Sequence, residues 1–462
     1  MERYDIIVVG AGPGGYVAAV RAAELGMRCA VVERAELGGV CLNWGCIPTK
    51  ALLKSAQVYN YTKHLGEYGL SEAEVKPDIA KIVARERGVS ATMSKGIEFL
   101  FKKNKIELHK GTATVVENHT VQVAPLEGEA YCIAADHIIL ATGSRPNSLP
   151  FAPIDGKKIL SYREALVPDA IPQSMAVIGS GAIGSELAYF YHSMGTQVYL
   201  IEYMDQIVPL EDEDVAAQLS RSLRKAGMKV MVSTNVKSVD TSAEGCTLTL
   251  ETKKGVEELH VECVLSAVGV RPNTENLGLE ALGVEMERGK IKVDEFFRTN
   301  VEGIYAIGDI VPTPALAHVA SAEAVVAVEK IAGLEVEPVD YSNIPGATYT
   351  TPEIASVGMT EKRLKAAGVP YKVGKFQFMA SGKAATAGER DGFVKLLFNP
   401  EDGKILGAHL IGASVSEMLS GIVLARKLGA TAKDIATAIH PHPSMSEGIM
   451  EAAAEVAKEM LK

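Results

Sequence analysis

The sequence is poor in cysteine, in basic residues relative to acidic ones, and in long apolar runs. Six cysteines among 462 residues are too few for the disulfide framework of a secreted protein, so we expect a cytoplasmic location. Lys and Arg number 47 against 57 Asp and Glu and form no dominant basic stripe, which argues against nucleic acid as the main partner. No uncharged apolar run reaches membrane-spanning length, and the first strand-like run, residues 4–9, begins too close to Met1 for a signal peptide. We therefore expect no membrane association.

Apolar residues and glycines are abundant. Hydrophobic residues make up 47% of the chain, enough for two to four globular domains with substantial cores. Short Val/Ile-rich runs are followed by alanine-rich helical patterns, and 43 glycines punctuate them. This alternation predicts an α/β fold built from parallel units.

One unit occurs twice at a constant spacing of 169 residues. Residues 6–33 read as strand, Gly-x-Gly-x-x-Gly turn, helix, strand and a terminal carboxylate, and residues 175–202 repeat this plan in register. The first copy has Gly10, Gly12, Gly15 and Glu33, and the second has Gly179, Gly181, Gly184 and Glu202. The sequence therefore predicts two dinucleotide-binding folds in one chain, against the alternative of two structural turns.

Each part of the repeated unit has a physical role in binding a dinucleotide. The first glycine makes the turn, the second lets the backbone approach the pyrophosphate, and the third allows the helix to pack on the strand. The N-terminus of the helix offers unpaired N–H groups to the phosphates. The carboxylate accepts hydrogen bonds from ribose hydroxyls. At Glu202 it also disfavours a 2′-phosphate, and residues 200–205 contain no arginine to neutralise one, so NAD is favoured over NADP.

Two cysteines lie five positions apart just after the first unit, in GGVCLNWGCIPTK at residues 38–50. A loop this small gains little stability from a disulfide. In an ideal helix, residues at this spacing lie roughly 8.6 Å apart, beyond the limit of about 7 Å for a disulfide. We expect a helix over residues 51–59 that reaches back over both cysteines, so Cys41 and Cys46 can bond only if Gly45 and Pro48 distort the segment. Such a pair is better explained by redox chemistry than by stability, and two unlinked core thiols are the alternative.

The combination of motifs resembles the flavoprotein disulfide reductases, the class I pyridine nucleotide-disulfide oxidoreductases, over essentially the whole chain. Within that family it is most similar to the enzymes that reoxidise dihydrolipoamide. The resemblance rests on six motifs: GAGPGG at 10–15, GGVCLNWGCIPTK at 38–50, ATGSRP at 141–146, GSGAIGSE at 179–186, GIYAIGD at 303–309 and HPHPSMSE at 440–447. Val40 and Ser444 depart from the pattern, since threonine is usual at both positions.

The resemblance implies FAD in the first fold, NAD in the second and no metal. It places Glu33 on the FAD ribose, Asp309 near the ribityl–phosphate part, and an ion pair of Lys50 with Glu186 beside the flavin ring. Cys41 would exchange with substrate while Cys46 faces the flavin. The implied FAD residues are Gly10, Gly12, Gly14, Gly15, Glu33, Lys50, Thr142, Gly143, Ser144, Asp309, Ala317 and His318. The implied NAD residues are Gly179, Gly181, Gly184, Glu186, Glu202 and Gly269. Lys50 as a solvated helix lysine and Asp309 as a turn former are the alternatives.

A dithiol substrate must lose protons as it is oxidised, so a base is required. Pro441 and Pro443 stiffen the backbone around His442, and Glu447 can orient that imidazole, so His442 is the predicted base. The rival interpretation is a capping box of Ser444 with Glu447 at the start of the following helix. Both are compatible, because a glutamate has two oxygens. His440 is predicted to be an ordinary loop histidine.

The expected activity is oxidation of protein-bound dihydrolipoamide through Cys41 and Cys46, with FAD as relay and NAD as acceptor. The alternatives are a glutathione reductase-like enzyme and a non-catalytic flavoprotein subunit of a larger complex. We expect a homodimer that meets a lipoyl-bearing protein of a 2-oxoacid dehydrogenase or glycine cleavage system. The expected division is residues 1–149 for FAD, 150–270 for NAD, 271–340 to complete the FAD domain and 341–462 as an α+β dimerisation domain.

Overall fold

The computed structural model describes residues 1–460, which divide into two compact units. The first unit contains residues 1–52, 80–147 and 270–339, and the second contains residues 53–79, 148–269 and the chain from residue 340 onward. The expected four-segment division remains a prediction, and its breaks at 149, 270 and 340 fall within two residues of the points where the chain passes between units. Residues 53–79 were expected in the first part, but they join the second unit.

A seven-stranded sheet with the order β3-β2-β1-β6-β5-β4, and β19 paired to β6, forms the centre of the first unit. The strands nearest β1 are parallel to it, and β4 and β5 continue the sheet as an antiparallel hairpin. The strands are β1 (Glu2–Val9), β2 (Cys29–Glu33), β3 (Glu107–Lys110), β4 (Thr112–Glu117), β5 (Thr120–Ala124), β6 (Tyr131–Leu140) and β19 (Ile304–Ala306). The predicted strand at residues 4–9 is confirmed, and it is buried because its apolar side chains face covering layers on both sides of the sheet.

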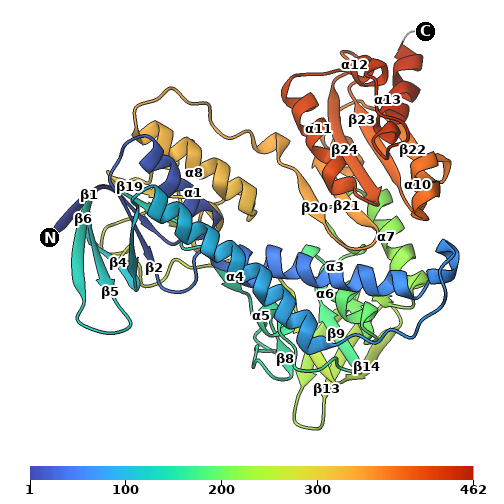
Figure 1. Cartoon of the computed structure of the whole chain (residues 1–462), viewed down its shortest axis with the longest axis horizontal. Coiled ribbons are helices and arrows are strands. Elements are labelled where there is room, and N and C mark those ends of the chain that lie inside the picture. Colours follow the sequence, from blue (N-terminus) through green and yellow to red (C-terminus); the bar gives the residue numbers. More distant parts are fainter. Residues whose placement is uncertain (461–462) are drawn as a thin grey trace. The chain divides into compact units, whose positions relative to one another are not determined.

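The helices of the first unit bring distant parts of the chain together. They are α1 (Pro13–Glu24), α2 (Gly39–Trp44), the start of α3 (Cys46–Thr62), α4 (Ile79–Lys103) and α8 (Ala317–Ile331). Helices α1 and α8 lie side by side, so the third chain segment completes the layer begun by the first (Figure 1). Short pieces connect them: β7 (Ser144–Pro146), β16 (Val270–Pro272), β17 (Met286–Glu287), β18 (Lys290–Ile291) and η2 (Gly308–Ile310).

The second unit begins with another parallel sheet, in the order β11-β10-β9-β15-β8. Its strands are β8 (Ile159–Leu160), β9 (Ser174–Ile178), β10 (Gln197–Ile201), β11 (Lys229–Met231) and β15 (Cys263–Ser266). Its helices are α5 (Tyr162–Leu166), α6 (Ala182–Ser193) and α7 (Glu213–Lys225), and a separate antiparallel sheet holds β12 (Asn235–Asp240), β13 (Cys246–Thr252) and β14 (Gly255–Val261). The predicted second nucleotide-binding fold is confirmed.

The C-terminal part of the second unit is an antiparallel sheet with helices, in the order β20-β21-β24-β23-β22. The strands are β20 (Gly346–Thr348), β21 (Glu353–Gly358), β22 (Lys372–Gln377), β23 (Phe393–Phe398) and β24 (Ile405–Gly412). The helices are α9 (Glu361–Ala367), α10 (Gly382–Ala387), α11 (Val415–Lys427), α12 (Ala432–Thr437) and α13 (Glu447–Met460). Helix α13 packs on β22 and β23, while α11 packs on β21 and β24. The predicted α+β character of this part is confirmed.

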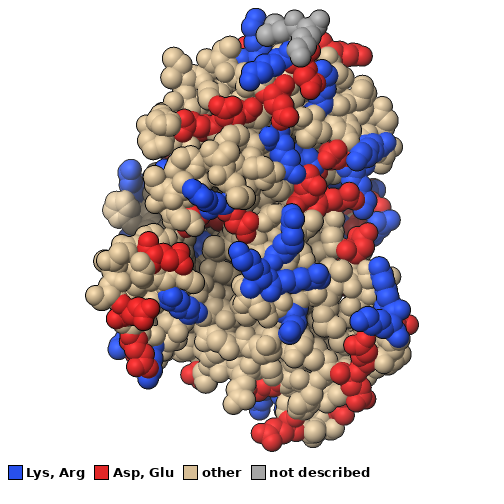
Figure 2. All heavy atoms as spheres, turned by 90° about the vertical axis from the view of Figure 1, so that its right-hand side faces the viewer, with Lys and Arg blue, Asp and Glu red and all other residues tan. Residues whose placement is uncertain are grey.

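Charged side chains of both signs occur together on the face shown in Figure 2, where Lys and Arg side chains are interspersed with Asp and Glu. Within residues 1–460, no helix combines the length and the apolar character needed to cross a bilayer.

Candidate functional site

The first glycine turn has the geometry that a dinucleotide requires. Gly10 has φ +103°, and a Cβ added there would lie 2.3 Å from the Ala141 carbonyl oxygen. A Cβ on Gly15 would lie 1.9 Å from the Gly10 oxygen, whereas a Cβ on Gly12 would meet nothing within 4 Å. Gly12 is the N-cap of α1 and offers no side-chain hydrogen bond to the first N–H groups of the helix. The turn therefore packs tightly at its first and third glycines and leaves open space beside the second.

The second turn repeats this pattern. Gly179 has φ +96°, and its Cβ would lie 2.5 Å from the Ala267 carbonyl oxygen. A Cβ on Gly184 would lie 2.0 Å from the Gly179 oxygen, and one on Gly181 would meet nothing within 4 Å. Gly181 is the N-cap of α6, again without a side-chain cap. The duplication that the sequence predicted is thus present in three dimensions.

The two carboxylates that end the repeated units are held alike. Glu33 accepts hydrogen bonds from Ala11 N at 2.7 Å and Ala35 N at 2.8 Å. Glu202 is buried and accepts from Met204 N at 2.9 Å. It also accepts from Ser180 N at 3.0 Å and from Ser180 Oγ at 2.6 Å. Glu202 Oε2 accepts both bonds from Ser180, but Glu202 Oε1 and the two oxygens of Glu33 each accept one of these bonds and keep a second lone pair for a ribose hydroxyl.

The cysteine pair lies at a break between two helices. Cys41 is in α2 and Cys46 begins α3, and Gly45 between them has φ −146° and ψ −111°, outside the helical range. The helix predicted over residues 51–59 extends back to Cys46 but not over Cys41, because the distortion expected at Gly45 is present and separates the two helices. Cys41 is half-buried and Cys46 is exposed. The Cys41 thiol hydrogen-bonds with Cys46, which, with burial, raises the pKa of Cys41, while the Lys50 charge acts in the opposite direction.

The cysteine segment begins directly on the first glycine turn. Gly38 N donates to the Ala11 carbonyl oxygen at 2.8 Å. A Cβ added to Gly39 would lie 2.7 Å from the Cα of Gly12, and both Gly38 and Gly39 have positive φ. Main chain thus packs against main chain, which places α2 beside the space that opens at Gly12.

Several residues that hold α2 in place were missed by sequence reasoning. Asn43 Nδ2 donates to the Leu37 and Gly39 carbonyl oxygens at 2.9 and 3.0 Å. Arg87 of α4 donates to the Asn43 carbonyl at 2.6 Å and stacks over the Trp44 ring at 4.5 Å. Asn43 lies inside a short helix and Arg87 lies in the first half of a long one, and neither position carries a local signal of this long-range contact.

The remaining residues predicted for FAD belong to the first unit. Asp309 accepts a 2.5 Å hydrogen bond from Ser144 Oγ, and Thr142 Oγ1 donates to the Asn273 carbonyl at 2.6 Å. Ala317 and His318 form the first turn of α8, whose N-cap Leu316 has no side-chain cap. Gly14 and Gly143 are the last two: a Cβ on Gly14 would lie 3.1 Å from Ile307 Cδ1, and one on Gly143 would meet nothing within 4 Å.

Lys50 and Glu186 belong to different units, so their predicted ion pair remains a prediction. Glu186 is buried on α6 and accepts a 2.9 Å hydrogen bond from Tyr349 N. Gly269, predicted for NAD, has φ +91° and open space where a Cβ would stand.

A polar cavity of about 360 Å³ lies beside Arg34, the residue that follows Glu33. Its lining residues were not predicted from the sequence. It is lined by Arg34, Arg145, Asn273, Glu275 and Asn276. Arg145 donates to Asn273 Oδ1 at 2.6 Å and pairs with Glu275, which lowers the pKa of Glu275 to about 2. The repeated RPN of residues 145–147 and 271–273 carried the signal, since the two copies lie on the paired strands β7 and β16 and directly after them.

The C-terminal histidine motif adopts the arrangement of a base with its orienting acid. His442 Nδ1 lies 2.7 Å from Glu447 Oε1, and the His442 side chain is 79% exposed. Glu447 Oε2 accepts from Ser444 N at 2.8 Å, and α13 begins at Glu447. The Ser444 N–H and the His442 side chain lower the pKa of Glu447. Ser444 Oγ has no partner among the described residues, so only half of the expected capping box forms. His440 Nδ1 contacts the Ala438 carbonyl, as a loop histidine does.

Comparison with known proteins finds one family along nearly the whole chain. Residues 4–324 match the pyridine nucleotide-disulphide oxidoreductases, and residues 344–453 match the dimerisation domain of the same family. A dihydrolipoyl dehydrogenase of Rhizobium etli is 48% identical over 98% of this chain and 97% of its own length. A leghemoglobin reductase of Vigna unguiculata is 44% identical over 98% and 87%.

Solved structures agree with this assignment. The crystal structure of LpdA from Mycobacterium tuberculosis superposes with a TM-score of 0.92 at 28% identity, covering 99% of this chain and 100% of that one. With two family descriptions covering both of its halves and relatives well above 40% identity, the chain belongs to the pyridine nucleotide-disulphide oxidoreductase family.

Proposed function

We propose that this chain is a dihydrolipoyl dehydrogenase, which oxidises the dihydrolipoyl group of a partner protein and uses FAD and NAD to carry the electrons away. The observation that carries the proposal is the contact of the cysteine segment with the first glycine turn. Gly39 touches Gly12 through the main chain, so the sulfurs of Cys41 and Cys46 belong to the same rigid piece as a nucleotide turn. Two electrons can pass between the cysteine sulfurs and a flavin only if the two groups lie close together.

The two glycine turns fit FAD and NAD. Each has an uncapped helix N-terminus for phosphates, open space beside its middle glycine, and a fixed carboxylate for a ribose. In the second turn, Glu202 is buried and would meet the 2′-phosphate of NADP with a like charge, which supports NAD. When bound, FAD takes up two electrons from the thiol pair and NAD accepts them as a hydride.

The cysteines of the chain carry the first half of the reaction. Cys41 and Cys46 are free thiols in the structure. In the oxidised form of the protein, a substrate thiolate attacks the disulfide between them at Cys41, which forms a mixed disulfide and releases the Cys46 thiolate. The second substrate thiol attacks the substrate sulfur of that mixed disulfide, which closes the oxidised ring and frees Cys41. The assignment of Cys41 to substrate rests on the family resemblance.

His442 accepts the protons that the substrate thiols lose. Its Nδ1 faces Glu447, so the imidazole donates from Nδ1 and presents the lone pair of Nε2. The carboxylate stabilises the imidazolium that forms when Nε2 takes a proton. The resemblance implies that His442 of one chain serves the cysteines of a second chain, so we propose a homodimer as the active unit, in the cytoplasm.

Steady-state kinetics test the proposal. The purified protein should bind flavin and oxidise dihydrolipoamide with NAD, with far weaker turnover when NADP replaces NAD. Oxidised glutathione with a reduced nicotinamide nucleotide is the challenge substrate. Faster turnover of glutathione than of lipoamide would support the glutathione reductase-like alternative. A folded flavoprotein without NAD-dependent turnover would support a non-catalytic subunit.

A further inference from the structure

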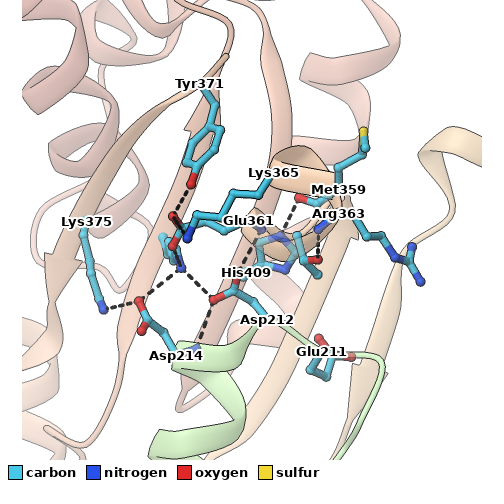
Figure 3. A network of polar contacts seen from close by, with 12 residues as sticks. Glu211, Asp212, Asp214, Met359, Glu361, Arg363, Lys365, Tyr371, Lys375 and His409 are labelled. Atoms are coloured by element: carbon cyan, nitrogen blue, oxygen red, sulfur yellow. Dashed lines mark hydrogen bonds and ion pairs between the residues drawn. The ribbon is translucent and has the colours of Figure 1, made fainter. Parts of the chain in front are cut away.

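A fully buried lysine lies in the antiparallel sheet of the second unit, far along the chain from the motifs discussed above. Lys395 is in the middle of β23, and its side chain is 1% exposed. Its Nζ lies 2.7 Å from Asp212 Oδ1 and 3.1 Å from Asp214 Oδ2, and it also pairs with Glu361. We call these four residues the Lys395 cluster. Figure 3 shows Asp212, Asp214 and Glu361 converging on one point, with Tyr371 donating to Glu361.

The cluster is not a metal site, because the ammonium group of Lys395 already occupies the position among the three carboxylates. Burial by itself lowers the pKa of Lys395, but its hydrogen bonds to Asp212 and Glu361 outweigh burial and raise it. His409 nearby is buried, contacts the Met359 carbonyl, and has its pKa lowered by burial, so it contributes no charge at neutral pH. A buried ion pair of this kind often adds little net stability, so what it positions is more informative.

The cluster joins two different substructures of the second unit. Asp212 is the N-cap of α7, where its side chain accepts from Asp214 N at 3.1 Å, and α7 belongs to the nucleotide-binding fold. Lys395 and Glu361 belong to the C-terminal sheet and its helix α9. Glu361 N also donates to Asp212, at 3.3 Å. The first turn of α7 is therefore fixed to the C-terminal part through two carboxylates: Asp212, which is buried, and Asp214, which also pairs with Lys375 at 2.8 Å.

The segment that follows Glu202 leads directly into the first turn of α7. Residues 203–211 lie between β10 and α7 and contain no helix or strand. At the near end Glu202 bonds to Met204 N and to Ser180 of the glycine turn, and midway Val208 N donates to the Ser180 carbonyl at 3.1 Å. Val208 has φ +41°, a strained value for a β-branched residue, which persists only where the surroundings hold it. Tyr203 and Leu210 are exposed, whereas Ile207 and Val208 are buried, so the middle of the segment is packed and its two flanks depend on their hydrogen bonds.

We infer that Lys395 is a positioning residue for NAD: through Asp212 it fixes the start of α7, and thereby holds residues 203–211 in the conformation that presents Glu202 and Ser180 to the adenosine ribose. The inference rests on the proposed function, because it requires the second glycine turn to bind NAD. Lys395 itself contacts neither Glu202 nor the second glycine turn.

The test is a variant that removes the charge pair without leaving a buried charge. Lys395→Met alone would strand Asp212 in the interior, which is strongly destabilising. The double variant Lys395→Met with Asp212→Asn avoids this, and asparagine remains a good N-cap. Helix α7 also keeps its mid-helix contacts, since Gln218 and Ser222 each bond to Asp391 at 2.5 Å.

Asp391→Ala is the matched control, because it removes two bonds between α7 and the C-terminal part at a point away from residues 203–211. We expect the dissociation constant for NADH to rise roughly fivefold or more in the double variant. It is measured by nucleotide fluorescence on the flavin-loaded protein, reduced beforehand with dithionite under anaerobic conditions so that NADH has no electron acceptor. It should change less than about twofold in Asp391→Ala. Anaerobic flavin reduction by dihydrolipoamide, which needs no NAD, should be unchanged in both.

An NADH dissociation constant within about twofold of the unaltered protein in the folded double variant would overturn the inference. An equal rise in Asp391→Ala would overturn it as well, because general loosening of α7 would then explain both. If the unaltered protein binds no NADH at all, the proposed function fails first and the inference falls with it.

Discussion

His442 Nδ1 lies 2.7 Å from Glu447 Oε1, and the other oxygen of the same carboxylate accepts the Ser444 N–H at 2.8 Å. One glutamate therefore orients the proposed base and starts α13, the two roles that the sequence left open. The arrangement fixes which imidazole nitrogen carries the proton, because the carboxylate can only accept. Nε2 is left as the basic atom, on a side chain that is 79% exposed.

His442→Gln should lower the rate of dihydrolipoamide oxidation by about 10²–10⁴-fold, the usual contribution of a positioned base. Glutamine is similar in size but cannot take up a proton near neutral pH. Steady-state assays with NAD check this, with the flavin absorption spectrum as evidence of correct folding. Near-normal turnover by a folded variant would reject the assignment.

Glu447→Gln should also lower turnover, by about tenfold or more, since the amide can donate to Nδ1 and so favour the imidazole tautomer that has no lone pair at Nε2. The loss should appear in kcat at saturating NAD. A variant with unaltered kcat would show that the tautomer is set by something other than Glu447.

Ser444→Ala separates the capping role of this turn from its chemistry. Ser444 Oγ is buried without a partner among the described residues, and the hydrogen bond to Glu447 comes from the backbone N–H, which alanine retains. Removing an unpaired buried hydroxyl is neutral or stabilising, so thermal unfolding should show no fall in Tm. A clear fall would mean that the hydroxyl caps α13 after all.

Cys41→Ser and Cys46→Ser should both abolish turnover of dihydrolipoamide, but for different reasons. With Cys41 as the exchanging sulfur, Cys46→Ser retains the thiol that forms a mixed disulfide with oxidised lipoamide, and Cys41→Ser does not. Mass spectrometry of the intact protein after incubation with lipoamide distinguishes them. An adduct on Cys41→Ser alone would mean that Cys46 is the sulfur that exchanges with substrate. The test discriminates between the two, because Cys46 is the more exposed cysteine in the structure.

The second glycine turn offers a pair of matched substitutions. Gly181→Ala adds a methyl group in open space at an ordinary φ of −63°, so the fold should persist while the methyl obstructs the pyrophosphate. We expect a KM for NAD raised by roughly tenfold or more, from the loss of about 1.4 kcal/mol or more of binding. Gly184→Ala would place a methyl 2.0 Å from the Gly179 oxygen and should instead lower Tm. Unchanged NAD kinetics in Gly181→Ala would argue against nucleotide binding at this turn.

The nucleotide folds and the pairing of His442 with Glu447 could be predicted because their signals are local in the chain. Glycine spacing, a strand before and a helix after determine the turn, and Glu33 and Glu202 follow at a fixed distance because the helix length sets it. The half-formed capping box shows the limit of such patterns, since Ser444 matched the motif but its Oγ is not used.

The supporting contacts could not be predicted because they join residues far apart in sequence. Arg87 reaches α2 from α4, and Asn273 reaches Thr142 across more than a hundred residues. Lys395 did carry a signal: a single lysine within the apolar run FVKLLF of β23, where a charge must find a partner. Which partner it finds depends on tertiary packing, and neither Asp212 nor Glu361 can be chosen from the sequence alone.

The close approach of Gly39 to Gly12 limits which amino-acid changes can shift the cysteine segment. Neither residue has a side chain at the point of contact, so exchanging neighbouring amino acids cannot move the sulfurs nearer to or farther from the dinucleotide turn. Variation around the pair can alter its acidity and its accessibility to a substrate. The separation of α2 from the first glycine turn, however, is set by peptide backbone, so an insertion or deletion is the kind of change that would alter it.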